Sequence, residues 1–83
     1  MENVVREILR SRGDLSVPIE KLSRNANLFD AGLSSFGTVE VMLALEEHLG
    51  VTLPEHMLTR ETFGSIAALC DAAETLRATT AAA

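Results

Sequence analysis

Apolar and polar residues follow the period of about 3.6 residues that is typical of an amphipathic helix in three stretches of the chain. The first stretch covers residues 3–12, and its apolar face holds Val4, Val5, Ile8 and Leu9. Asn3 is a residue type that caps helix N-termini, and Gly13 is a residue type that ends helices. The pattern therefore predicts a helix from Asn3 to Arg12.

The second stretch, residues 35–49, gives the clearest helix pattern, and Gly50 directly after it is a stop signal. The third stretch begins at Thr62 or Phe63 and ends at Leu76. Its buried stripe is predicted to hold Ile66, Leu69, Ala73 and Leu76. Residues 77–83 are expected to form a flexible tail.

The segments between these helices carry residues that interrupt helices. Residues 13–34 contain Pro18, Gly32 and a polar run at 23–27, so a long loop is predicted there, with a short turn around Ile19 to Leu22. Apolar residues within this loop are expected to pin it to the core. After the second helix, Pro54 favours extended backbone at the preceding residue, and a short helical turn is expected over Glu55 to Leu58.

The length and composition favour one small all-α domain. The chain has 83 residues, of which 47% are hydrophobic, so it should fold as a single unit, with an ordered core over about residues 3–76. Trp and Tyr are absent, so the core must be mainly aliphatic. A domain of this size leaves little room for an enclosed active site.

The net charge of −5 is concentrated in the middle of the chain. No Lys or Arg lies between Arg24 and Arg60, and this interval contains Asp30, Glu40, Glu46, Glu47 and Glu55. Such a surface repels phosphate backbones, which argues against nucleic-acid binding. It would attract proteins with basic patches, although an ordinary solvated acidic surface explains the same pattern.

The predicted helix over residues 35–49 carries two apolar stripes. One holds Val41, Met42, Leu45 and Leu49, and the other holds Phe36, Val39 and Leu43, with Glu40 and Glu47 beside it. Both stripes cannot easily be buried in one small core. Either the second stripe is exposed as a protein-docking surface, or the long first loop folds over it.

Ser34 and Ser35 lie where the first loop becomes this helix. One serine suffices to cap the helix, because a serine oxygen accepts a free N–H of the first turn. The other would be presented at a helix N-terminus, where an attached anion is favoured. Capping chemistry alone leaves open which serine has which role.

Residues 30–36, Asp-Ala-Gly-Leu-Ser-Ser-Phe, resemble the Asp-x-Gly-x-Asp-Ser-Leu attachment motif of acyl and peptidyl carrier proteins. The resemblance extends from about Asn25 to Leu76 and includes Leu53-Pro54 and residues 62–69. It implies a small four-helix bundle of the acyl-carrier type, with a long first loop and a short third helix. The second helix of such a bundle begins at the modified serine, which by position is Ser35.

The resemblance also implies what the chain does. A phosphopantetheinyl transferase would attach 4'-phosphopantetheine to Ser35, and the thiol of this arm would hold an acyl or aminoacyl group as a thioester. A loading ligase or transferase would supply that group, and a downstream synthase or transferase would receive it. The carrier itself would not be an enzyme. The positions that match the family's partner contacts are Phe36, Val39, Glu40, Leu43, Glu46 and Glu47.

Three residues depart from the family pattern. Ser34 replaces the acid before the attachment serine, Phe36 replaces the leucine after it, and Gly37 stands where an acid is frequent. These changes remove negative charge beside the arm. They favour a specialised, free-standing carrier, such as a discrete aminoacyl carrier, over a general fatty-acid carrier. The cargo and the pathway stay open.

Other functions fit the sequence less well. A serine hydrolase would need His48 or His56 as its base, and no strand precedes Ser34 to build a nucleophile elbow. No calcium-binding loop is present, and the lone Cys70 is expected to be buried and structural. A helical adaptor that binds partners through the second stripe remains the alternative. No signal peptide or membrane span is recognised, so a monomeric cytoplasmic protein is expected.

Overall fold

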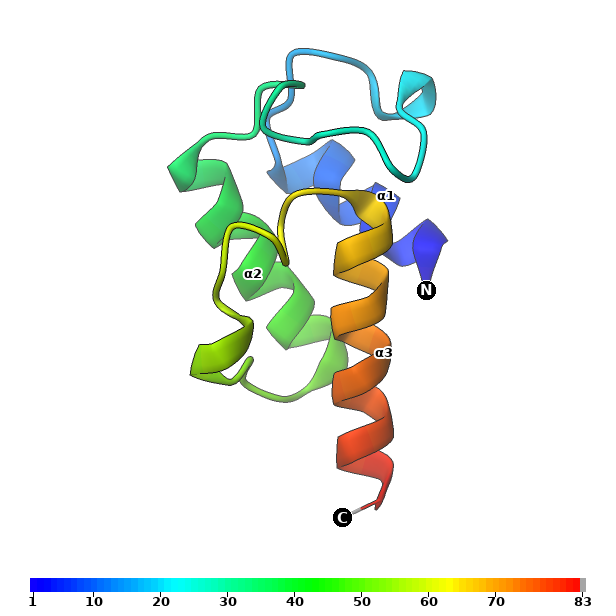
Figure 1. Cartoon of the computed structure of the whole chain (residues 1–83), viewed down its shortest axis with the longest axis vertical. Helices are drawn as coiled ribbons and strands as arrows, with labels where there is room; N and C mark the ends of the chain where they lie inside the picture. The colour runs from blue at the N-terminus through cyan, green and yellow to red at the C-terminus, as the bar shows by residue number, and fades with distance from the viewer. Residues whose placement is uncertain (83) are drawn as a thin grey trace.

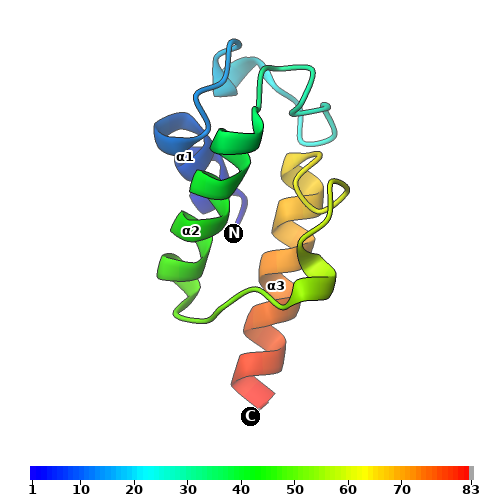
Figure 2. The same cartoon turned by 90° about the vertical axis from the view of Figure 1, so that its left-hand side faces the viewer.

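The computed structural model describes the backbone of residues 1–82 and the side chains of residues 1–78. Three α-helices and two short 3-10 turns follow one another as α1 (Glu2–Arg12), η1 (Ile19–Lys21), α2 (Ser35–Leu49), η2 (Glu55–Met57) and α3 (Ile66–Ala82). Residues 1–82 contain no strand, which confirms the all-α prediction. The long first loop arches over one end of the bundle, where α1 ends and α2 and α3 begin (Figures 1 and 2).

The predicted fourth helix is not confirmed. The segment that the resemblance assigned to a short third helix is the single 3-10 turn η2. The chain turns away soon after Leu58, because the Thr59 hydroxyl oxygen accepts a hydrogen bond from the Thr62 N–H at 3.2 Å. Too few residues lie between Pro54 and the turn that begins at Thr59 to build a longer helix.

Helix α1 begins one residue earlier than predicted. Met1 occupies the N-cap position, and its carbonyl accepts a bond from the Val5 N–H at 3.0 Å. Asn3 therefore lies inside the helix, exposed, and the prediction that it caps α1 is wrong. Gly13 ends the helix as predicted, and its N–H still donates to the Leu9 carbonyl at 2.9 Å.

Helix α3 begins later and ends later than predicted. Its first turn is capped by the Ser65 hydroxyl oxygen, which accepts from the Ala68 N–H at 3.0 Å, so Thr62 and Phe63 belong to the preceding turn. The helix continues to Ala82, in a run rich in alanine, the strongest helix former, and the predicted end at Leu76 is wrong. Ala83, the last residue of the predicted tail, lies outside the described residues.

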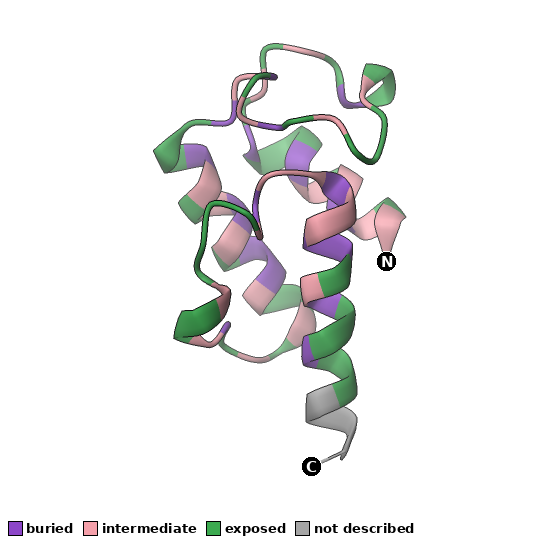
Figure 3. Ribbon diagram, in the orientation of Figure 1, coloured by how far each residue is buried: buried purple, intermediate pink, exposed green. Residues whose placement is uncertain are grey.

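The core lies where the three helices face one another, beneath the first loop (Figure 3). Each part of the chain contributes fully buried side chains, namely Leu9 from α1, Leu28 from the loop, Leu45 from α2, and Ile66 and Leu69 from α3. Burying such a side chain stabilises the fold by about 1.5–3 kcal/mol. Cys70 is buried among them as predicted, and burial raises the pKa of its thiol. None of the helices described is long and apolar enough to cross a membrane.

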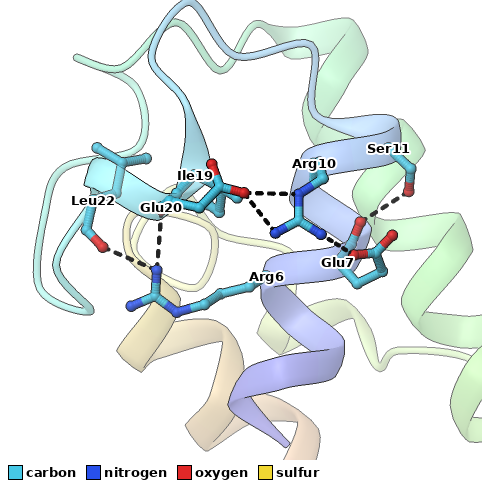
Figure 4. A network of polar contacts seen from close by, with 7 residues as sticks. All are labelled: Arg6, Glu7, Arg10, Ser11, Ile19, Glu20 and Leu22. Carbon is cyan, nitrogen blue, oxygen red and sulfur yellow. Dashed lines mark hydrogen bonds and ion pairs between the residues drawn. The ribbon is translucent and has the colours of Figure 1, made fainter.

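Arginines of α1 anchor the first half of the loop (Figure 4). The Arg6 guanidinium donates hydrogen bonds to the carbonyls of Ile19 and Leu22 at 3.1 and 2.9 Å. On the next turn, Arg10 pairs with Glu7 and with Glu20, the latter at 2.7 Å. Hydrogen bonds from its own backbone amide and from Arg10 lower the pKa of Glu20. Turn η1, predicted around Ile19, is thereby fixed against α1.

Backbone hydrogen bonds anchor the second half of the loop. The Leu28 N–H donates to the Gly64 carbonyl and the Ala67 N–H donates to the Arg24 carbonyl, both at 2.8 Å. The two halves are joined by the Ser16 N–H, which donates to the Ala31 carbonyl at 2.8 Å. The long loop is therefore a fixed part of the fold, and it determines where α2 begins.

Candidate functional site at the start of helix α2

The structure separates the roles of the two adjacent serines. Ser34 is the N-cap of α2, and its hydroxyl oxygen accepts a hydrogen bond from the Gly37 N–H at 3.0 Å. Its carbonyl accepts bonds from the backbone N–H and the hydroxyl of Thr38, both at 2.8 Å. Ser35 is the first residue of the helix, exposed, and its hydroxyl has no hydrogen-bond partner among the described residues. Capping thus occupies Ser34 and leaves Ser35 accessible.

The loop before the serines holds them at the surface. Gly32 has a φ of 107°, and a Cβ there would lie 2.6 Å from the Ser16 hydroxyl oxygen and 2.8 Å from the Ser16 nitrogen. Only glycine fits this turn. Leu33 is then buried in the core, which fixes the chain one residue before the cap. The next two side chains, those of Ser34 and Ser35, are exposed.

Ser35 borders a groove of about 320 Å³ between α2 and the turn that follows η2. The groove is lined by apolar side chains, including Phe29, Met42, Leu58 and Phe63, and by the hydroxyls of Thr38 and Thr59. Arg60 is the one charged residue in the lining. A larger groove of about 590 Å³ lies between α1 and α2, but Ser35 does not border it, so we place the site at the smaller one.

The second apolar stripe of α2 is exposed. Phe36 retains 74% of its accessible surface, Val39 48% and Leu43 43%, and Leu58 of the neighbouring turn retains 46%. The first loop packs over the end of the bundle and does not cover these four residues, which we call the apolar surface. The alternative in which the loop covers the stripe is therefore excluded. No pattern in the sequence predicted that Leu58 belongs to this surface, because only the folded turn brings it beside α2.

The three acids predicted to lie at a docking surface have partners within the chain. The Arg12 guanidinium of α1 lies 3.9 Å from a carboxylate oxygen of Glu40 and 3.6 Å from one of Glu47. The Glu46 carboxylate accepts a hydrogen bond from the Leu53 N–H at 2.7 Å. Arg12 therefore neutralises only part of the acidic interval, since Asp30, Glu46 and Glu55 form no ion pair among the described residues.

Gly37 is buried where α2 crosses the end of α1. A Cβ at this position would lie 2.7 Å from the Gly13 carbonyl oxygen and 3.2 Å from a methyl of Leu33. No side chain fits there unless the backbone shifts. Close packing therefore explains why this chain has glycine at a position where the resemblance led us to expect an acid.

The groups around Ser35 fit an attached phosphodiester. The backbone N–H groups of Ser35 and Phe36 have no hydrogen-bond partner in the described part of the chain, and a helix N-terminus favours an anion. The groove beside Ser35 is lined by one cation and no carboxylate. The donor set is thus suited to the phosphate of a 4'-phosphopantetheine arm.

No hydrolytic site surrounds the serine. His48 and His56 are exposed, and neither borders the groove next to Ser35. Residues 1–78 also contain no cluster of side chains suited to hold a metal ion. The site therefore presents the Ser35 hydroxyl beside an apolar surface, and the described residues place no histidine or carboxylate in the groove to act as its base.

The chain is similar to known proteins in sequence. The family model described as "Phosphopantetheine attachment site" matches residues 3–73. The chain is 41% identical over 71 residues to an aminoacyl carrier protein of Agrobacterium fabrum, and the matched region covers 86% of each of the two chains. It is 39% identical over 67 residues to aminoacyl carrier protein 2 of Bradyrhizobium diazoefficiens, and the matched region covers 81% of this chain and 71% of the relative.

The fold is also similar to solved structures. One crystal structure contains an engineered Bradyrhizobium japonicum glycine:[carrier protein] ligase with a carrier protein from Agrobacterium tumefaciens and AMP. This chain matches it with a TM-score of 0.85 and 39% identity, over 89% of this chain and 99% of the matched one. A solution structure from Agrobacterium tumefaciens matches the whole of both chains with a TM-score of 0.78 and 37% identity.

Proposed function

The chain belongs to the phosphopantetheine attachment-site family of carrier proteins, and we propose that Ser35 is its attachment residue. Its cofactor is a covalent 4'-phosphopantetheine, on whose thiol an acyl or aminoacyl group is held as a thioester. One observation supports Ser35 over Ser34. The Ser34 hydroxyl caps α2, whereas the Ser35 hydroxyl takes no part in the cap.

The attachment reaction requires a separate enzyme. The Ser35 hydroxyl oxygen would form a phosphodiester bond with the phosphate of coenzyme A that bears the pantetheine, and adenosine 3',5'-bisphosphate would leave. The serine proton would pass to a base on a phosphopantetheinyl transferase, because the described residues place no base beside Ser35. The chain is thus a substrate of this step and contributes no catalysis to it.

We further propose that the cargo is an amino acid. Two similar proteins are named aminoacyl carrier proteins, and a similar carrier has been solved together with a glycine:[carrier protein] ligase. An amino acid ligase of that kind would dock on the apolar surface formed by Phe36, Val39, Leu43 and Leu58. Glu40, Glu46 and Glu47, which the resemblance implies are partner contacts, also lie on α2, and each has a partner within the chain.

Mass spectrometry tests the attachment residue. Incubation with coenzyme A and a broad-specificity transferase should add one phosphopantetheine to the wild-type protein and none to Ser35→Ala. Ser34→Ala is the matched control. It should still be modified, although loss of the cap should lower stability by about 1 kcal/mol. Modification of Ser35→Ala, or of Ser34 itself, would refute the assignment.

The same material tests the cargo. The modified protein should be labelled when it is incubated with a glycine:[carrier protein] ligase, ATP and radioactive glycine or another small amino acid. Labelling by a fatty-acid synthase malonyl transferase alone would refute an aminoacyl carrier while leaving the carrier function intact. If the wild-type protein gains no mass in the first experiment, the helical adaptor becomes the better interpretation of the apolar surface.

A further inference from the structure

Arg60 differs from most cationic side chains of the protein because it lacks a carboxylate partner. Arg6, Arg10, Arg12 and Arg24 each form an ion pair. Among the residues whose side chains are described, Arg60, Lys21 and Arg77 form none. Of these three, only Arg60 lines the groove that Ser35 borders.

Arg60 is held by an aromatic ring. Its guanidinium carbon lies 4.0 Å from the centre of the Phe29 ring, which is a cation–π contact. Such a contact satisfies the face of the guanidinium and leaves the N–H donors at its edge available. Planar N–H donors of this kind suit a phosphate, which arginine binds through paired hydrogen bonds.

Both residues of this pair are positioned by hydrogen bonds in their own turns. The Asn27 side-chain oxygen accepts from the N–H groups of Phe29 and Asp30 at 2.9 and 3.2 Å, which fixes the turn that carries Phe29. On the other side, the Thr59 hydroxyl oxygen accepts from the Thr62 N–H at 3.2 Å and lies 3.0 Å from the Thr62 hydroxyl. These bonds fix the backbone turns that carry Phe29 and Arg60, and the ring contact orients the guanidinium in the absence of a ligand.

The rest of the groove suits an anion joined to a flexible chain of mixed polarity. Its lining contains no carboxylate, so nothing within it competes for the Arg60 guanidinium. Apolar side chains, Met42 and Phe63 among them, make up much of the remaining wall. Ser35 lines the same groove as these residues, so a phosphate attached to its hydroxyl would begin at the edge of this groove.

We propose that Arg60 binds the phosphodiester that joins the phosphopantetheine arm to Ser35, and that it thereby holds the arm against the groove. This inference rests on the proposed attachment at Ser35. Arg60 is a positioning residue, since it fixes where the arm begins and takes no part in forming the thioester. Phe29 supports it by holding the guanidinium.

The test compares the phosphopantetheinylated wild type with Arg60→Gln, and with Arg77→Gln as the matched control. Arg77 is exposed on α3, forms no described ion pair and does not line the groove. Attachment should raise the melting temperature of the wild type and of Arg77→Gln by about 2–4 °C at low salt. In Arg60→Gln the rise should be less than half as large, and 0.5 M salt should remove the difference, because it screens an exposed pair.

Phosphorus NMR gives a readout at the proposed contact. The phosphodiester resonance should shift between low and high salt in the wild type and in Arg77→Gln, and should be insensitive to salt in Arg60→Gln. Arg60→Lys should recover part of the salt dependence, because it keeps the charge and loses the stacked plane. Circular dichroism of each unmodified variant checks that it is folded, which is expected because Arg60 is exposed.

The possible results separate this inference from the proposed function. If Ser35 is not modified at all, the proposed function fails and the inference fails with it. If Ser35 is modified and Arg60→Gln matches the controls in both measurements, only the inference is overturned. It is also overturned if Arg60→Gln slows loading by a ligase but leaves the free protein's phosphorus spectrum unchanged, since Arg60 would then contact the partner.

Discussion

At position 37, one missing side chain decides how closely two helices approach. Gly37 is a poor helix former within the first turn of α2, yet it is buried against the Gly13 carbonyl and Leu33. Glycine lowers the helix propensity at this position, but it allows α2 to pack closely against the end of α1 at Gly13. The same residue removes an acid from beside Ser35, so packing and the charge of the site are linked at a single position.

Gly37→Ala should therefore destabilise the protein. Alanine gains about 1 kcal/mol of helix propensity. Its Cβ would meet the Gly13 carbonyl oxygen at 2.7 Å, and relieving so short a backbone contact should cost about 3 kcal/mol, which leaves a net loss of about 2 kcal/mol. Urea denaturation measures the difference. Ser35→Ala, in the same turn but exposed, is the control and should change stability by less than about 0.5 kcal/mol. A Gly37→Ala protein as stable as the wild type would contradict the packing argument.

At the scale of elements, α1 acts as the support for the loop that positions α2. Its arginines are unequal in this role (Figure 4). Arg6 is partly buried and satisfies two loop carbonyls, whereas Arg10 forms exposed ion pairs with Glu7 and Glu20. The loss of Arg6 would leave two carbonyls without their donor, and the loss of Arg10 would leave groups that water can solvate.

Arg6→Gln should lower the free energy of unfolding by about 1–3 kcal/mol, because half-buried carbonyls lose a charged donor. Arg10→Gln is the matched control on the next turn and should cost at most about 1 kcal/mol. Chemical denaturation compares the two variants directly. Equal losses in both would show that the loop is held by its backbone hydrogen bonds and apolar residues, and that Arg6 contributes little.

At the scale of the whole molecule, the sequence predicted well the features that depend on neighbouring residues. The bounds of α2 and the second stripe of Phe36, Val39 and Leu43 follow from local periodicity. Of the first stripe, Val41 and Leu45 are buried as predicted, and Met42 and Leu49 are partly buried. Partners from distant segments could not be predicted in this way. Arg12 beside two acids of α2, and Arg60 beside Phe29, are brought together only by the fold.

The start of α3 and the missing fourth helix show the same limit. Thr62 and Phe63 continue the apolar pattern of α3, but a side-chain bond from Thr59 and the bond between Leu28 and Gly64 hold this segment in a turn. Helix periodicity contains no information about such competing bonds. The extension of α3 to Ala82 had a local signal in the alanine run, which the prediction of a flexible tail overlooked.

The apolar surface should matter for recognition and little for stability. Leu43→Glu places a charge at a half-exposed position, so the protein should still fold, while loading by a docking ligase should fall at least about 10-fold in kcat/KM. Ala78→Glu adds the same charge at an exposed position on α3 and should load normally. Steady-state loading of the two modified variants checks this. Undiminished loading of Leu43→Glu would place the ligase on another face.

The short distance from Ser35 to Phe36, Val39 and Leu43 also bears on whether two partner proteins can bind at the same time. Ser35 and Leu43 are eight positions apart on α2, which is a rise of about 12 Å. A typical protein partner covers about 800 Å² of surface, which is wide enough to include both residues. If partners dock on the apolar surface as proposed, a bound partner would also cover Ser35, and a second partner could not bind there until the first had dissociated. Successive enzymes would then bind one after another, and the residence time of each on the carrier would limit the overall rate of the reactions that use it. Selection should accordingly favour partners with a high dissociation rate over partners with a high affinity.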